Sequence, residues 1–152
     1  MATKLASRPG LYASDFYVWA QEQAALLRAK RFDALDLDHL IEEVEGLADA
    51  KRSAVLNNAR IVMEHLLKLE HSPAIDPRNK WRATVREHRN RLEADLTPRL
   101  LQVLDDELTR WYGLARKSAF EAMRDHGEDA AAAALPEICP YTRQQVTGDW
   151  LP

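Results

Sequence analysis

Apolar residues recur at steps of three, four or seven along one stretch of the chain, and this spacing constrains the fold more than any other feature. They are Leu37, Ile41, Val44, Ala48, Val55, Ala59, Val62, Leu66 and Leu69. Such steps keep side chains on one face of an α-helix, whereas no stretch alternates apolar and polar residues as a strand does. The pattern predicts a helix over residues 37–71. Because an uninterrupted pattern of this length is unusual and Gly46 costs about 1 kcal/mol relative to alanine, we expect the helix to be bent or broken near 46–51.

The remaining periodic segments predict three further main helices, near residues 14–30, 79–96 and 98–126. Ser14 is the expected N-cap of the first, and Thr97 followed by Pro98 is typical of the start of the last. The segment SPAIDPRN holds two prolines and predicts a loop, and EDAAAAAL favours a short helix. Thr142 with Gln145 three residues later is a capping-box pattern for a short C-terminal helix near 142–147.

Together these segments predict an all-α fold, an up-and-down bundle of four main helices plus the short C-terminal helix. A chain of 152 residues suits a single domain over residues 1–152. We expect residues 1–12 to form a flexible N-terminal arm.

Composition limits the classes of protein to which the chain can belong. Cys139 is the single cysteine, which excludes an internal disulfide and any zinc site built from several cysteines. The start MATKLASRPG lacks the apolar run of a secretion signal, and nowhere do about 18 apolar residues follow one another. We therefore expect a cytoplasmic protein without membrane contact.

Charge is distributed unevenly, although the net charge is only -3. Residues 33–49 hold seven acids and no lysine or arginine, whereas residues 78–91 hold six bases and one acid. The two segments can pair within one chain if the long helix bends near Gly46, or between two copies across a two-fold axis. The favoured interpretation is a non-enzymatic interaction module that forms a homodimer or binds a bacterial protein partner. Nucleic acid on the arginine-rich helix is the weaker alternative, because a pI near 6.0 is low for a phosphate-binding domain.

The segment HLIEEVEGL raises the alternative of a metal-assisted enzyme. His39 lies three and four residues before Glu42 and Glu43, hence on one helical face, and His65 lies further along the same predicted helix. Di-iron bundles use Glu-x-x-His contributed twice, and here the order is reversed and occurs once. No cofactor is therefore expected. A bound divalent transition metal is expected only if the protein is a metal-assisted enzyme. The sequence alone does not decide whether the protein is an enzyme.

A second set of polar residues suggests a buried network or a partner surface. Lys51, Asn58 and His65 recur every seven residues on an otherwise apolar side of the helix. Since buried polar groups find partners, His65 is expected to be held by a neighbouring glutamate or arginine. The set of candidates is Glu42, Glu45, Asn58, His65, Arg82, Arg86 and Arg89.

Five segments in order resemble one known family. They are DFYVWAQEQAALLR, RFDALDLDHLIEEVEGL, MEHLLKLEH, KWRATVREHRNRL and CPYTRQQV. From Tyr12 to Leu151 the chain resembles the bacterial family named domain of unknown function 29. The resemblance implies an all-helical, bundle-like cytoplasmic domain with no established reaction. It therefore predicts a fold but no enzymatic activity.

Overall fold

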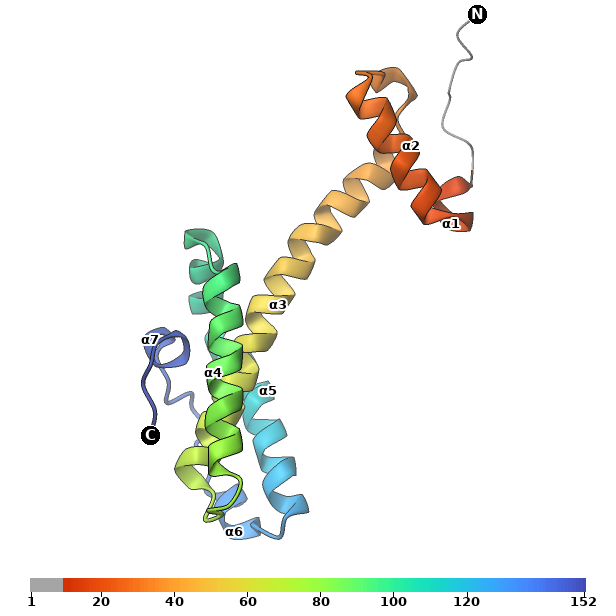
Figure 1. Cartoon of the computed structure of the whole chain (residues 1–152). Helices are drawn as coiled ribbons and strands as arrows, with labels where there is room; N and C mark the ends of the chain where they lie inside the picture. The colour runs from red at the N-terminus through yellow and green to blue at the C-terminus, as the bar shows by residue number, and fades with distance from the viewer. Residues whose placement is uncertain (1–9) are drawn as a thin grey trace, which may run out of the picture. The chain divides into compact units, whose positions relative to one another are not determined.

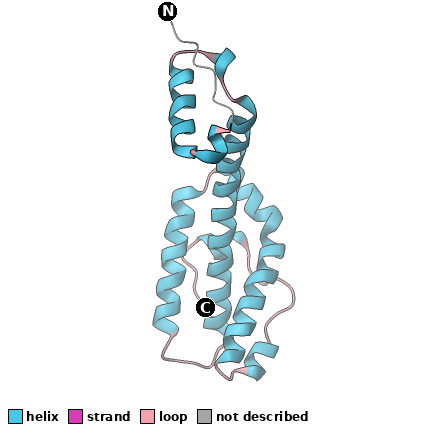
Figure 2. Ribbon diagram, turned by 90° about the vertical axis from the view of Figure 1, so that its right-hand side faces the viewer, coloured by secondary structure: helices cyan, strands magenta, loops and turns pink. Residues whose placement is uncertain are grey.

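The computed structural model describes residues 10–152, and this part of the chain is helical with no β-strand (Figures 1 and 2). The four long helices are α2 (Phe16–Arg28), α3 (Leu37–His71), α4 (Arg78–Asp95) and α5 (Pro98–Asp125). The short elements are α1 (Leu11–Ser14), the 3-10 turn η1 (Phe32–Ala34), α6 (Asp129–Ala133) and α7 (Arg143–Thr147). The predicted all-α class and the predicted set of main helices are confirmed. No described helix is both long enough and apolar enough to cross a membrane.

The described part of the chain divides into two compact units between Asp49 and Ala50, and α3 contributes to both. The predicted break is absent, because α3 is α-helical without interruption through Gly46. The division between the units nevertheless falls inside the window 46–51 in which a break was expected. Of the predicted N-terminal arm, residues 1–9 lie outside the described part, while Leu11 and Tyr12 belong to α1.

The N-terminal unit packs α1 and η1 against α2. Trp19, Gln23 and Leu26 are the buried residues of α2. Ser14 is not the N-cap of this helix, as the sequence suggested, because it is the last residue of α1. Asp15 takes the capping position instead, since its backbone is non-helical (φ -152°, ψ 82°) and its carboxylate accepts a hydrogen bond from the amide of Val18.

The C-terminal unit is built around the second part of α3, α4 and α5 (Figure 2). Its core includes Leu56, Leu66, Leu92, Leu104 and Tyr112, all at most 1% exposed. Burying a leucine of this kind contributes about 1.5–3 kcal/mol relative to leaving it exposed. Helix α7 packs on α4 and α5, and α6 packs on α5.

The caps that the sequence predicts at the later helix ends are confirmed by the structure. Thr97 accepts a hydrogen bond from the amide of Leu100 and is followed by Pro98 at the start of α5. Thr142 and Gln145 form both hydrogen bonds of the predicted capping box of α7. Gly127 has a φ of 76°, a left-handed conformation that favours glycine, and it ends the turn after α5.

Candidate functional site

The first part of α3 exposes large apolar side chains to solvent. Leu37, Ile41, Val44 and Leu47 form what we call the α3 apolar face, and they are between 55% and 69% exposed. They follow one another at steps of four, three and three residues, which places them on one side of the helix. The sequence pattern placed Leu37, Ile41 and Val44 in one continuous apolar stripe with Val55 and later residues, but α3 has buried residues only from Val55 onward. Contiguous exposed apolar side chains of this kind mark interaction surfaces.

Carboxylates line one edge of the α3 apolar face. Asp38, Glu42, Glu45 and Asp49 form what we call the acidic flank, and all four are exposed. Each directly follows an apolar residue on that side of the helix, so the acids run parallel to the face about 100° further around the axis. No lysine or arginine occurs between residues 33 and 49. The flank therefore favours positive charge in whatever lies beside it.

The opposite edge of the face is occupied by a cluster of aromatic and polar side chains. The Tyr12 hydroxyl donates to Glu43 Oε1 at 2.6 Å, and its ring stacks on that of His39 with 4.0 Å between the centroids. His39 Nδ1 lies 2.8 Å from Asp36 Oδ2, which also accepts from Trp19 Nε1 at 3.0 Å. These contacts fasten α1 and α2 to the beginning of α3.

Two groups of this cluster have shifted pKa values. The hydrogen bond to Glu43 raises the pKa of Tyr12 to about 12, because phenolate would repel the carboxylate that it faces. Partial burial acts to raise the pKa of Asp36, but the hydrogen bonds from His39 and Trp19 outweigh it and the pKa is lowered. Asp36 is thus a carboxylate that orients His39 and Trp19.

The residues predicted as metal ligands lie in both units. His39, Glu42 and Glu43 belong to the N-terminal unit, where His39 and Glu43 already have protein partners, and His65 belongs to the C-terminal unit. Within residues 10–152 no three histidine, cysteine, aspartate or glutamate side chains are grouped so that they could hold a metal ion. The metal-assisted alternative stays a prediction.

His65 has a different partner from the one the sequence suggested. Its Nδ1 lies 2.9 Å from the carbonyl oxygen of Ile61 one turn earlier, and a carbonyl only accepts, so Nδ1 carries the hydrogen. Burial lowers the pKa of His65, against the opposing effect of that hydrogen bond. The ring is therefore neutral near pH 7, with Nε2 as an acceptor.

The predicted polar line on α3 joins this helix to α4. Asn58 is 8% exposed, and its Oδ1 accepts from His88 Nδ1 at 2.6 Å. Lys51 forms an ion pair with Asp95 at 2.6 Å. Two of the three positions at seven-residue spacing thus hold α4 in place, which is a structural role.

The three arginines that the sequence grouped together have separate roles. Arg82 and Arg86 are exposed, whereas Arg89 is buried and donates to the carbonyl oxygens of the C-terminal segment. Its hydrogen bonds reach Gln145 at 2.6 Å, Trp150 at 2.7 Å and Val146 at 3.1 Å. The spacing in the sequence could have indicated that Arg89 is buried, because it lies four residues after Val85 and three before Leu92, both of which are buried.

Comparison with known proteins gives one match. The family model described as "Domain of unknown function DUF29" matches residues 11–151. No curated protein matches the chain. No solved structure matches it either.

Proposed function

Since the chain belongs to the family of domain of unknown function DUF29, whose description assigns no activity, we propose a function from its surface: a protein-interaction module that binds a basic amphipathic helix of another protein. The binding surface is the α3 apolar face together with its acidic flank. The observation that carries the proposal is the exposure of Leu37, Ile41, Val44 and Leu47 along one side of a single helix. An amphipathic helix docks through side chains at this spacing.

The apolar face supplies the affinity in this proposal. Each of its side chains is more than half exposed, so a docked helix would remove substantial apolar area from water. Complete burial of one leucine, isoleucine or valine contributes about 1.5–3 kcal/mol. Partial burial of four such side chains therefore offsets part of the cost of association, and ion pairs with the acidic flank add to it.

The acidic flank determines which partner fits. A helix with lysines or arginines beside its apolar stripe would place them next to Asp38, Glu42 and Glu45. A second copy of this α3 segment would bring the same carboxylates and no base, and like charges side by side are unfavourable. The surface therefore favours a different, basic chain over self-association through α3.

The test uses a synthetic helical peptide with leucine along one face and lysine along the other, labelled with a fluorophore. Its fluorescence anisotropy should rise on titration with the protein. Val44→Glu places a charge in the middle of the face, and we expect the affinity to fall by about tenfold or more. Val44 is 64% exposed, so the substitution leaves the fold intact.

Two controls make the result specific. Ile138 is 83% exposed in the C-terminal unit, and Ile138→Glu should leave peptide binding unchanged. A peptide with glutamate in place of lysine should bind at least tenfold more weakly, because it faces the acidic flank. Equal binding of both peptides, or no effect of Val44→Glu, would contradict the proposal. Light scattering that finds a dimer which Val44→Glu dissociates would identify a second copy as the occupant instead.

A further inference from the structure

The C-terminal unit holds a cavity of about 540 Å³ that the proposed interaction does not use. It lies where the end of α3, the connection between α3 and α4, the start of α4 and the end of α5 meet. The volume is within the range of about 300–1,000 Å³ that is typical of small-molecule sites. All of its lining residues belong to residues 50–152.

The walls of the cavity suit an apolar ring. Trp81 from α4 and Met123 from α5 supply an indole and a thioether, and Pro77 and Ala74 come from the connecting segment. Aromatic rings and methionine sulfur make favourable contacts with a further ring. These walls favour a ligand whose body is an aromatic ring.

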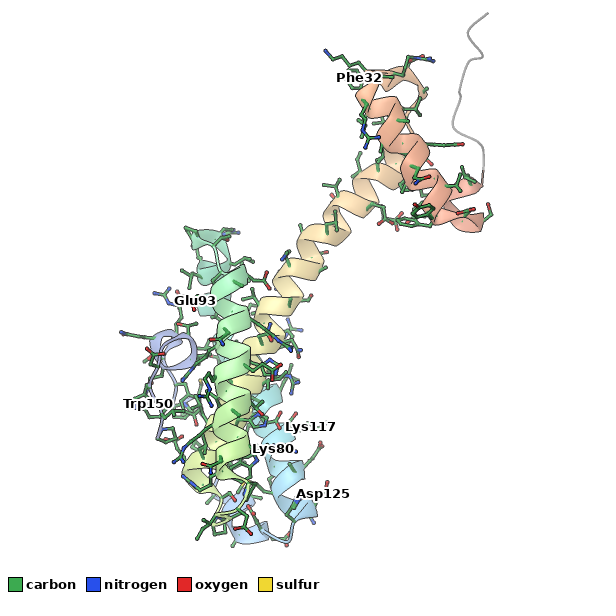
Figure 3. The ribbon with its side chains drawn as sticks, in the orientation of Figure 1. Phe32, Lys80, Glu93, Lys117, Asp125 and Trp150 are labelled. Atoms are coloured by element: carbon green, nitrogen blue, oxygen red, sulfur yellow. The ribbon has the colours of Figure 1, made fainter. Side chains whose placement is uncertain are left out.

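Positive charge is in surplus around the cavity. Lys68 pairs with Glu64 at 2.6 Å, but the same carboxylate also pairs with Arg60 at 3.3 Å, so one anion serves two cations. Lys80 lines the cavity as well, and within residues 10–152 it forms no ion pair (Lys80 is labelled in Figure 3). Its ammonium group is available to a carboxylate of the ligand.

Two residues of the lining present hydrogen-bond acceptors for which the described part of the structure gives no donor. Oε2 of Glu128 is buried and has no hydrogen-bond partner among the described residues. His65 also lines the cavity, and because its Nδ1 donates to Ile61, its Nε2 is left as an acceptor. A buried acceptor without a partner is unfavourable, so a ligand that supplies a hydroxyl or amino group gains from it.

From these observations we infer that the cavity binds a small aromatic carboxylic acid that carries a hydroxyl or amino hydrogen-bond donor. The ring lies against Trp81 and Met123, the carboxylate pairs with Lys80, and the donor faces Glu128 or His65. This inference is independent of the α3 apolar face, which belongs to the other unit.

The test is isothermal titration of the protein with 3-phenyllactate, which combines the ring, the carboxylate and one hydroxyl. Two analogues separate the contributions: 3-phenylpropionate lacks the hydroxyl, and 3-phenylpropan-1-ol lacks the carboxylate. We expect saturable binding of phenyllactate, weaker binding of phenylpropionate, and at least tenfold weaker binding of the alcohol. Lys80→Gln should weaken phenyllactate binding by about threefold to tenfold and leave the alcohol unchanged, as for one partly exposed charge pair.

Lys117 provides the matched control, since it is an exposed lysine of α5 that does not line the cavity (Figure 3). Lys117→Gln should leave phenyllactate binding unchanged. No saturable binding, or equal binding of 3-phenylpropylamine and phenyllactate, would overturn the inference. So would a Lys80→Gln protein that binds phenyllactate as well as the original.

Discussion

Arg89 shows how a single side chain fixes the end of the chain in place. The residue is 9% exposed, and its guanidinium group binds three main-chain carbonyls and no carboxylate. Burial lowers the pKa of Arg89, although Asp149 acts in the opposite direction. Only the planar fork of arginine presents several donors at fixed angles, so the contact is specific to this residue type.

We predict that Arg89→Lys destabilises the protein by about 1–3 kcal/mol. The three N–H donors of an ammonium group radiate from one nitrogen, so they cannot match the spacing of the guanidinium fork, and some of the three carbonyls lose their donor. The measurement is urea unfolding followed by circular dichroism. Arg86→Lys, on the exposed side of the same helix, should change stability by less than about 0.5 kcal/mol. Equal effects of the two substitutions would show that the Arg89 hydrogen bonds do not hold the C-terminal segment.

Two histidines of the C-terminal unit predict a loss of stability on mild acidification. Burial lowers the folded-state pKa of both His65 and His88 below the ordinary value of 6.5. The unfolded chain then binds more protons as the pH falls below 6.5, so the free energy of unfolding decreases with falling pH in that window. Asp36, whose pKa is lowered from 3.8, contributes only at more acidic pH.

The check is the urea midpoint at pH 7.5, 6.5 and 5.5. We expect it to fall between 6.5 and 5.5, and to fall less in His65→Gln, which cannot take up the proton. A midpoint that stays constant down to pH 5.5 would contradict the lowered pKa values.

Helix α3 continues through Gly46, although glycine disfavours the interior of a helix. Gly46 is helical, and a Cβ added there meets no atom within 4 Å. Gly46 also lies two residues from both Val44 and Ala48, which places it on the side of the helix away from the α3 apolar face.

Gly46→Ala should therefore stabilise the helix by about 0.5–1 kcal/mol, by restricting the unfolded chain without a steric cost. The far-ultraviolet circular dichroism signal should melt at higher temperature, and the affinity for the leucine and lysine peptide should not change. A lower melting temperature would indicate that α3 needs flexibility at this position.

Local sequence signals predicted the helices and several of their ends well. Thr97 with Pro98, and Thr142 with Gln145, act within four residues, so the hydrogen bonds that they form can be inferred from spacing alone. Ser14 was a wrong N-cap because α1 ends there, and a helix of four residues leaves almost no periodic signal.

The candidate surface was harder to predict, because periodicity indicates an apolar side and not what covers it. The stripe from Leu37 to Leu69 looks uniform in sequence, yet Val44 is exposed and Val55 is buried. The partners of Arg89 and the lining of the cavity come from segments far apart in the chain, and no spacing rule connects them. The pairing of the acidic and basic segments stays a prediction. For Arg89, one of the six bases, the partners are main-chain carbonyls, and the sequence does not indicate them.

The whole chain has a net charge of only -3, although the N-terminal unit contains a strongly acidic segment. If the acidic flank selects the partner and the α3 apolar face holds it, the two contributions respond differently to salt. Screening shortens the reach of charges to about 3 Å at 1 M salt, while apolar contacts persist.

We predict that the affinity for the leucine and lysine peptide falls by about tenfold between low salt and 0.5 M salt and then levels off. Anisotropy titrations at several salt concentrations measure this. Complete loss of binding at high salt would indicate a purely electrostatic attraction without docking on the apolar face. No change with salt would exclude a role for Asp38, Glu42, Glu45 and Asp49.

The position of the partner on one side of the first part of α3 can be measured directly. Two-dimensional ¹H–¹⁵N spectra of the labelled protein, recorded during titration with the leucine and lysine peptide, report which amides sense the ligand. We expect shifts concentrated in residues 37–49, with the amides of α4 and α5 unchanged. Shifts concentrated in residues 50–152, with residues 37–49 unaffected, would contradict binding on α3.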